Sequence, residues 1–93
     1  MKVQSHFLVE GRVQGVFYRA SASDEAIRLG LSGWVRNRRN GSVELVACGQ
    51  AEDVDRLEAW LWQGPRMSNV TSVIRTQQPV QEWDGPFRIK STT

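Results

Sequence analysis

The chain contains little sulfur and almost no imidazole, with one cysteine, Cys48, and one histidine, His6. A single cysteine excludes an internal disulfide framework, and the two residues together are too few for a structural zinc site. A cysteine-dependent phosphatase would need an arginine soon after Cys48, but GQAEDV follows instead. We therefore interpret Cys48 as a small sheet residue. We interpret His6 as a strand residue without a catalytic role, because no carboxylate or nucleophile stands near it in sequence.

Long hydrophobic runs are also absent. No apolar run approaches the ~20 residues that span a bilayer, and the N-terminal sequence MKVQSHFLVEG lacks the apolar core of a signal peptide. We therefore expect a cytoplasmic protein without a membrane partner. A length of 93 residues suffices for one small domain, residues 1–93. The 40% apolar and 24% charged residues are typical of an ordinary soluble globular protein.

Alternating and β-branched residues predict the strands. Four long strands and a short final one are expected at residues 3–10, 31–38, 42–49, 69–78 and 87–90. Asn40-Gly41 is a strong hairpin signal between the second and third of them. The turn is either the tight two-residue type or a longer loop, and the two choices direct opposite sets of side chains toward the core.

Apolar residues at helical spacing predict two helices, over residues 18–30 and 51–63. Gly30 is placed to end the first helix in a left-handed cap, and Gly64-Pro65 stops the second. The order is strand, helix, strand, strand, helix, strand, with a short extra strand at the end. This order predicts an α+β, ferredoxin-like split βαβ sandwich in which two helices cover one face of an antiparallel sheet.

The stretch GRVQGVFYRA, residues 11–20, lies between the first strand and the first helix. Its glycines can turn several backbone N–H groups toward one point, and the helix N-terminus behind them adds partial positive charge. Arg19 can complete this anion cradle with a planar fork of donors that matches a phosphoryl group. On the loop alone, a glycine turn with a solvated arginine is the simpler interpretation. The loop matches neither a P-loop nor the GxGxxG fingerprint.

Two longer motifs change that balance. The run VEGRVQGVFYR resembles the first signature of the acylphosphatase family, and GWVRNRRNGSVELVACG resembles its second, with the internal spacing intact. GPRMSNV, FRIK and the order of elements are also similar to that family, so the resemblance spans nearly the whole chain. Tyr18 stands where the family usually carries phenylalanine, and Asn40 where aspartate is common. A buried Tyr18 hydroxyl would need a hydrogen-bond partner.

The resemblance implies an enzyme that cleaves acyl phosphates into a carboxylate and inorganic phosphate, without metal, cofactor or covalent intermediate. It implies that Arg19 binds the phosphoryl group together with loop amides, and that Asn37 holds the attacking water. The expected phosphate-binding residues are Gln14, Gly15, Val16, Phe17, Tyr18 and Arg19. So sparse a site is chemically sufficient, because a carboxylate with a pKa of about 4 leaves without a general acid. What remains is positioning and electrostatic stabilisation.

One alternative stays open: a non-catalytic anion or nucleic-acid binding module on the same fold. Arg36, Arg38 and Arg39 crowd the hairpin, where they form either a solvated edge that discourages sheet pairing or a basic patch for RNA. RNA-recognition modules of this fold stack bases on aromatic residues of the central strands, and SVELVAC has none. We therefore expect small-molecule partners, no nucleic acid and a monomer. Glu10 and Glu44 are candidate acids only if they line the same pocket.

Overall fold

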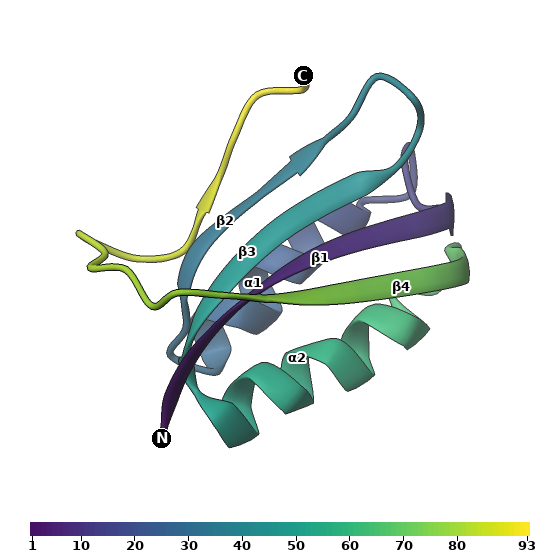
Figure 1. The fold of residues 1–93 in the computed structure, drawn as a ribbon. Coiled ribbons are helices and arrows are strands. Elements are labelled where there is room, and N and C mark those ends of the chain that lie inside the picture. The colour runs from purple at the N-terminus through teal and green to yellow at the C-terminus, as the bar shows by residue number, and fades with distance from the viewer.

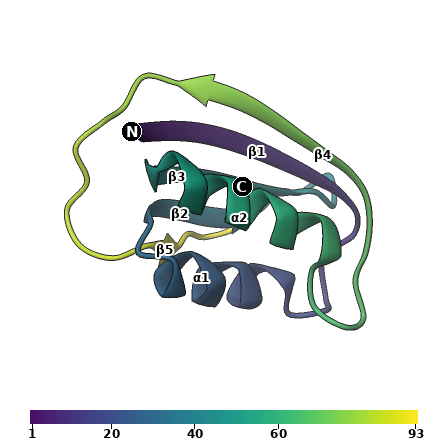
Figure 2. The ribbon, with the colours of Figure 1, turned by 90° about the horizontal axis from the view of Figure 1, so that it is seen from below.

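A computed structural model describes residues 1–93 as five strands and two helices. The strands are β1 (Lys2–Arg12), β2 (Ser32–Asn37), β3 (Val43–Gln50), β4 (Asn69–Gln78) and β5 (Arg88–Ile89). The helices are α1 (Tyr18–Arg28) and α2 (Ala51–Gln63). The strands form one layer and both helices cover the same face of it (Figures 1 and 2). The predicted ferredoxin-like order of elements is confirmed.

The sheet has the strand order β4-β1-β3-β2-β5. β1 pairs antiparallel with both β3 and β4, and β2 pairs antiparallel with β3. The predicted antiparallel arrangement therefore holds for the four long strands. β5 differs, because it runs parallel to β2. Residues 79–87 carry the chain from the end of β4 to the opposite edge of the sheet, so that β5 enters beside β2 in the same direction (Figure 1).

The core lies between the sheet and the two helices. Phe7 of β1 and Leu45 of β3 are opposite one another in the ladder and both are fully buried. The predicted apolar stripe of α2, formed by Val54, Leu57 and Leu61, is also fully buried. Burying each such side chain contributes about 1.5–3 kcal/mol, so this face fixes α2 on the sheet. No helix of the protein combines the length and apolar character needed to cross a membrane.

The first helix ends as the sequence predicts. Ala22 and Ala26 face the core, with Leu29 at its margin. Gly30 then adopts a left-handed conformation, with φ of 73°. The N–H of Leu31 donates to the carbonyl of Ala26 at 2.9 Å, which is the bond of a Schellman cap. Glycine at this position turns the chain directly into β2.

Tyr18, the first residue of α1, ties the two helices together. Its ring packs against Trp60 of α2, with 5.6 Å between ring centroids. Its hydroxyl donates to the carbonyl of Leu61 at 2.7 Å. In a continuing helix the N–H of residue 65 would reach that carbonyl, but Pro65 has no N–H. The tyrosine hydroxyl therefore caps the end of α2 and has the partner that its burial requires.

The hairpin between β2 and β3 uses the longer of the two turns. Asn37 and Val43 are the last pair of the ladder. Beyond them, the N–H of Arg38 donates to the carbonyl of Ser42 at 2.8 Å. The side-chain oxygen of Asn40 accepts hydrogen bonds from the N–H and the hydroxyl of Ser42. This register places Asn37 at the end of β2, beside the loop that leads into α1.

Candidate active site

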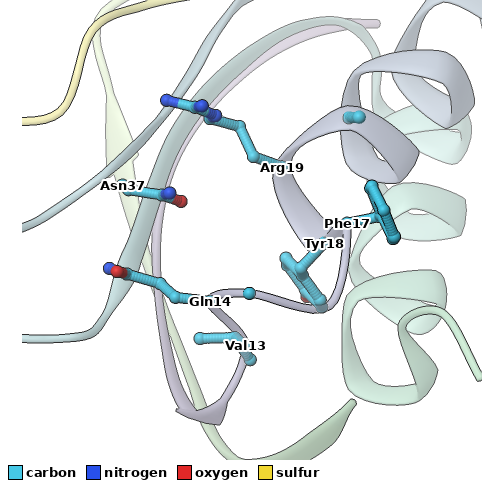
Figure 3. A pocket seen from close by; sticks show the side chains of 8 residues that line it. Val13, Gln14, Phe17, Tyr18, Arg19 and Asn37 are labelled. Atoms are coloured by element: carbon cyan, nitrogen blue, oxygen red, sulfur yellow. The ribbon is translucent and has the colours of Figure 1, made fainter. Parts of the chain in front are cut away.

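The predicted site residues meet at one open pocket of about 260 Å³ (Figure 3). It lies between the loop after β1, the first turn of α1 and the end of β2. The predicted residues that border it are Gln14, Gly15, Phe17, Tyr18, Arg19 and Asn37. Val16 is the exception, because its side chain packs into the core. Val13 and Ala20 border the pocket too, although nothing in the sequence distinguished them beyond their position in the motif.

The backbone of the loop before α1 alternates between negative and positive φ angles. Gly15 has φ of 74° and Phe17 φ of 62°, whereas Gln14, Val16 and Tyr18 have no positive φ. Such alternation turns successive N–H groups toward one side and forms anion-binding concavities. The N–H groups of Gly15, Val16 and Phe17 donate to no acceptor in the protein, and α1 has no side-chain cap. Unpaired donors therefore lie at the positive end of a helix, and two of the residues that carry them, Gly15 and Phe17, border the pocket.

Phe17 is the only residue other than glycine with a positive φ, and it is 83% exposed. A left-handed conformation costs such a residue about 1–2 kcal/mol. Figure 3 shows its ring on the far side of the loop from the side chains of Arg19 and Asn37. Its contribution to the space between them is therefore its main chain. Strain of this kind is concentrated at ligand-binding segments.

Arg19 carries the only charged side chain that borders the pocket. Its Nη1 donates to the main-chain carbonyl of Lys90 at 3.2 Å. Arg19 forms no ion pair, unlike Arg36 and Arg75, which both pair with carboxylates. Its positive charge is thus not neutralised, and Figure 3 shows the guanidinium reaching across toward β2. The contact with Lys90 left no signal in the sequence, because it joins residues 71 apart.

Asn37 enters the same space from the opposite side. Figure 3 shows its side chain between those of Arg19 and Gln14. The side-chain oxygen, Oδ1, is buried and accepts no hydrogen bond. Its main chain is held at the other edge of β2, where its carbonyl accepts the N–H of Thr93 at 3.1 Å. Since buried acceptors are nearly always paired, Oδ1 is available to a donor brought into the pocket.

The side chain of Gln14 has a use that sequence reasoning missed. Its Nε2 donates to the carbonyl of Arg38 at 2.7 Å and to the carbonyl of Ser42 at 2.8 Å. Both carbonyls belong to the hairpin turn that follows Asn37. The two donors of Gln14 are therefore committed to the hairpin. Gln14 is one of the predicted phosphate-binding residues, and it can therefore donate to a ligand only through its main-chain N–H.

The chemistry available in the pocket is narrow. The side chains that border it include no carboxylate, imidazole, thiol, aliphatic hydroxyl or amine. Tyr18 is buried with its hydroxyl on Leu61, and this burial raises the pKa of the phenol and keeps it neutral. Nowhere in the structure do three or more His, Cys, Asp or Glu side chains gather as metal ligands. The only charge at the pocket is thus a guanidinium without an ion pair, and together with the free loop N–H groups it favours an anionic ligand.

Neither candidate acid reaches this pocket. Glu44 lies on the helix-free face of the sheet, where its carboxylate contacts His6 Nε2 at 2.7 Å and accepts a hydrogen bond from Arg36 Nε at 2.8 Å. Burial favours the neutral carboxyl, but the hydrogen bonds from His6 and Arg36 outweigh it and hold the pKa of Glu44 below its usual value. Arg36 is therefore paired rather than free at the hairpin. Glu10 borders a separate, smaller hollow beside the turn.

The family model and the curated relatives of this chain name one family. The family model described as Acylphosphatase matches residues 5–89. An acylphosphatase of Xanthomonas euvesicatoria pv. vesicatoria is 56% identical over 72 residues, 77% of this chain and 82% of that protein. An acylphosphatase of Methylococcus capsulatus is 60% identical over 68 residues, 73% of this chain and 74% of that protein.

Solved structures agree over nearly the whole chain. An acylphosphatase from Coxiella burnetii is similar with a TM-score of 0.91 at 40% identity, over 96% of this chain and 93% of that one. An acylphosphatase from Bacillus subtilis gives a TM-score of 0.90 at 34% identity, over 95% of this chain and 98% of that one. With the family model and close relatives in agreement, the chain belongs to the acylphosphatase family.

Proposed function

We propose that this protein hydrolyses acyl phosphates into a carboxylate and inorganic phosphate. The observation that carries the proposal is the convergence of Arg19, which has no ion pair, free loop N–H groups and Asn37 on one pocket that no carboxylate borders. The names of the relatives, which are acylphosphatases, support the same reaction. We propose that the substrate is a small molecule and that the enzyme acts as a monomer.

In this proposal the phosphoryl group sits in the loop. The N–H groups from Gly15 to Arg19 donate to its non-bridging oxygens, at the positive end of α1. Arg19 adds a planar pair of donors and a full positive charge. The transition state of phosphoryl transfer spreads charge over these same oxygens, so donors fixed before the reaction stabilise it. The lack of carboxylates around the pocket keeps the dianion from being repelled.

Asn37 then orients the attacking water. Its Oδ1 accepts one hydrogen of that water and directs the oxygen lone pair at phosphorus, in line with the bond to the acyl group. A new P–O bond forms while the bond from phosphorus to the acyl oxygen breaks, and the carboxylate leaves with the electron pair. The proton of the water passes to a phosphate oxygen. No general acid is needed, because the leaving carboxylate has a pKa of about 4.

The side chains around the pocket also support a direct, metal-free reaction. None of them is a nucleophile that could carry a phosphoryl group, and none is a carboxylate that could hold a divalent cation. Water bound at Asn37 is therefore the nucleophile, and the oxygens of the phosphoryl group meet only N–H donors. We accordingly propose that the enzyme works without metal and without a covalent intermediate.

The test is hydrolysis of benzoyl phosphate in the presence of a chelator. We expect turnover by the wild type and a loss of about 10²–10³ in kcat/KM for both Arg19→Ala and Asn37→Ala. Asn37→Ala should keep its inhibition by orthophosphate, whereas Arg19→Ala should lose it. Arg56→Ala, on the exposed surface of α2 beside Asp53, is the matched arginine control and should stay active.

Two outcomes would contradict the proposal. A folded wild-type protein that binds orthophosphate but turns over no acyl phosphate would instead be a non-catalytic anion-binding module. Near-normal rates in a folded Arg19→Ala or Asn37→Ala variant would remove the role assigned to that residue.

A further inference from the structure

We propose that Gln14 is a positioning residue, which sets the placement of Asn37 relative to residues 13–17, here called the phosphate loop. The inference rests on the proposed function and adds a role that the reaction scheme above does not contain. The Gln14 side chain donates two hydrogen bonds, to the carbonyls of Arg38 and Ser42, at 2.7 and 2.8 Å.

The two halves of the site belong to separate segments of the chain. The phosphate loop follows β1, whereas Asn37 ends β2, and 24 residues separate Gln14 from Arg38. No other hydrogen bond joins residues 13–17 to the hairpin turn. In-line attack needs the water at Asn37 to be aligned with a phosphoryl group held by the loop. The Gln14 amide is thus the direct hydrogen-bonded link between the two.

The hairpin is already held at its other contacts. Asn37 pairs with Val43 of β3, and its carbonyl accepts the N–H of Thr93. The N–H of Arg39 in turn donates to the carbonyl of Thr93 at 2.7 Å. These bonds fix Asn37 within the sheet, and none of them reaches residues 13–17. The Gln14 side chain supplies the hydrogen bonds between these loop residues and the hairpin turn that follows Asn37.

Few other side chains could replace this amide. Nε2 has two hydrogens, and each one meets a separate carbonyl on either side of the turn. Asparagine carries the same donors but is one methylene shorter, so it cannot reach both carbonyls from the same backbone. Methionine has nearly the same length and shape but donates nothing. Gln14→Asn therefore tests the length of the side chain, and Gln14→Met tests its ability to donate hydrogen bonds.

The expected effect falls on the chemical step. Misplacing a reacting group by about 1 Å can cost about 10²-fold in rate. We therefore expect Gln14→Met to lower kcat for benzoyl phosphate by about 10-fold or more. Inhibition by orthophosphate should change by less than about threefold, because Arg19 and the loop amides are unchanged. Gln14→Asn should show the same pattern, and it provides a second variant if Gln14→Met does not fold. Gln77→Met, on the exposed surface of β4, is the matched control and should keep the wild-type rate.

The decisive test is a double-mutant cycle with Asn37→Ala. If Gln14 acts through Asn37, then adding Gln14→Met to Asn37→Ala should lower the remaining rate by less than about twofold. Equal losses in both backgrounds, or a loss of orthophosphate binding with kcat unchanged, would overturn the positioning role. A lower thermal stability with an unchanged kcat would also overturn it, since that is the mark of a purely structural contact.

The same measurements distinguish failure of the inference from failure of the proposed function. A wild type without turnover overturns the hydrolase and, with it, the positioning role. A wild type that turns over benzoyl phosphate, with Gln14→Met equally fast, overturns the positioning role alone.

Discussion

Replacing Tyr18 by phenylalanine removes a single oxygen atom from the junction of the two helices. The hydroxyl is the hydrogen-bond donor to the carbonyl of Leu61, and Pro65 cannot take its place. Tyr18 is 1% exposed and Leu61 0%, so water has little access to that carbonyl in the variant. An unpaired buried acceptor costs about 1–3 kcal/mol. We expect the free energy of unfolding of Tyr18→Phe to fall by that amount, and Tm to fall by about 4–8 °C per kcal/mol.

The same burial makes the stability of the wild type fall at alkaline pH. Because burial raises the pKa of Tyr18 above its usual value of 10.0, the folded state keeps a proton that the unfolded state releases. The stabilising effect is therefore complete below about pH 10. As the pH rises above that value, the free energy of unfolding should fall by about 1.4 kcal/mol per pH unit more steeply than in Tyr18→Phe.

The assay is denaturant unfolding of both proteins from about pH 7 to pH 11, with benzoyl phosphate hydrolysis measured in parallel. Because Tyr18 is the only tyrosine of the chain, phenolate absorbance reports its ionisation alone. The hydroxyl points at α2 and away from the pocket, so hydrolysis at pH 7 should change by less than about twofold. A variant as stable as the wild type would refute this reasoning, as would a tyrosine that ionises near pH 10 in the folded protein.

Two further predictions concern residues outside the reacting groups. Glu44→Gln removes the shared partner of His6 and Arg36. The pKa of Glu44 is held below its usual 4.5, so its stabilising effect is present above that pH and is lost as the pH falls through the lowered pKa. Unfolding experiments from about pH 3 to pH 7 should therefore show a flatter acid limb in the variant, and an unchanged limb would contradict the assignment. Phe17→Asn places a residue that tolerates the left-handed region at φ of 62° and should be neutral or stabilising by up to about 1 kcal/mol, with hydrolysis within about threefold of the wild type. A rate loss of about 10-fold or more in that variant would show that the ring itself contributes to the site.

Local patterns were sufficient for most of the fold. The predicted bounds of α2 and β4 agree with the structure, because an apolar helical stripe, a Gly64-Pro65 stop and a β-branched run are all signals carried by neighbouring residues. The left-handed cap at Gly30 is equally local. The parallel pairing of β5 with β2 was not predictable, since it depends on the path of a long loop around the sheet. The longer hairpin turn stayed undecided because its register depends on contacts beyond the turn itself.

The candidate site followed from the motifs rather than from periodicity. The resemblance directed attention to Arg19 and Asn37, and the structure brings both to one pocket. The motifs did not predict which atoms of the neighbouring loop residues face the pocket. The side chain of Val16 points into the core, and that of Gln14 bonds to a hairpin 24 residues away. These are tertiary contacts, and no spacing along the chain records them.

The most direct test of how the site works is a titration with orthophosphate, followed through the backbone amide resonances and the Arg19 side chain. We predict saturable shifts concentrated in residues 15–19, with only modest dependence on salt, and their loss in Arg19→Ala. If those amides do not move, or if the shifts instead spread over Arg38 and Arg39 with a steep dependence on salt, then the loop does not hold the phosphoryl group.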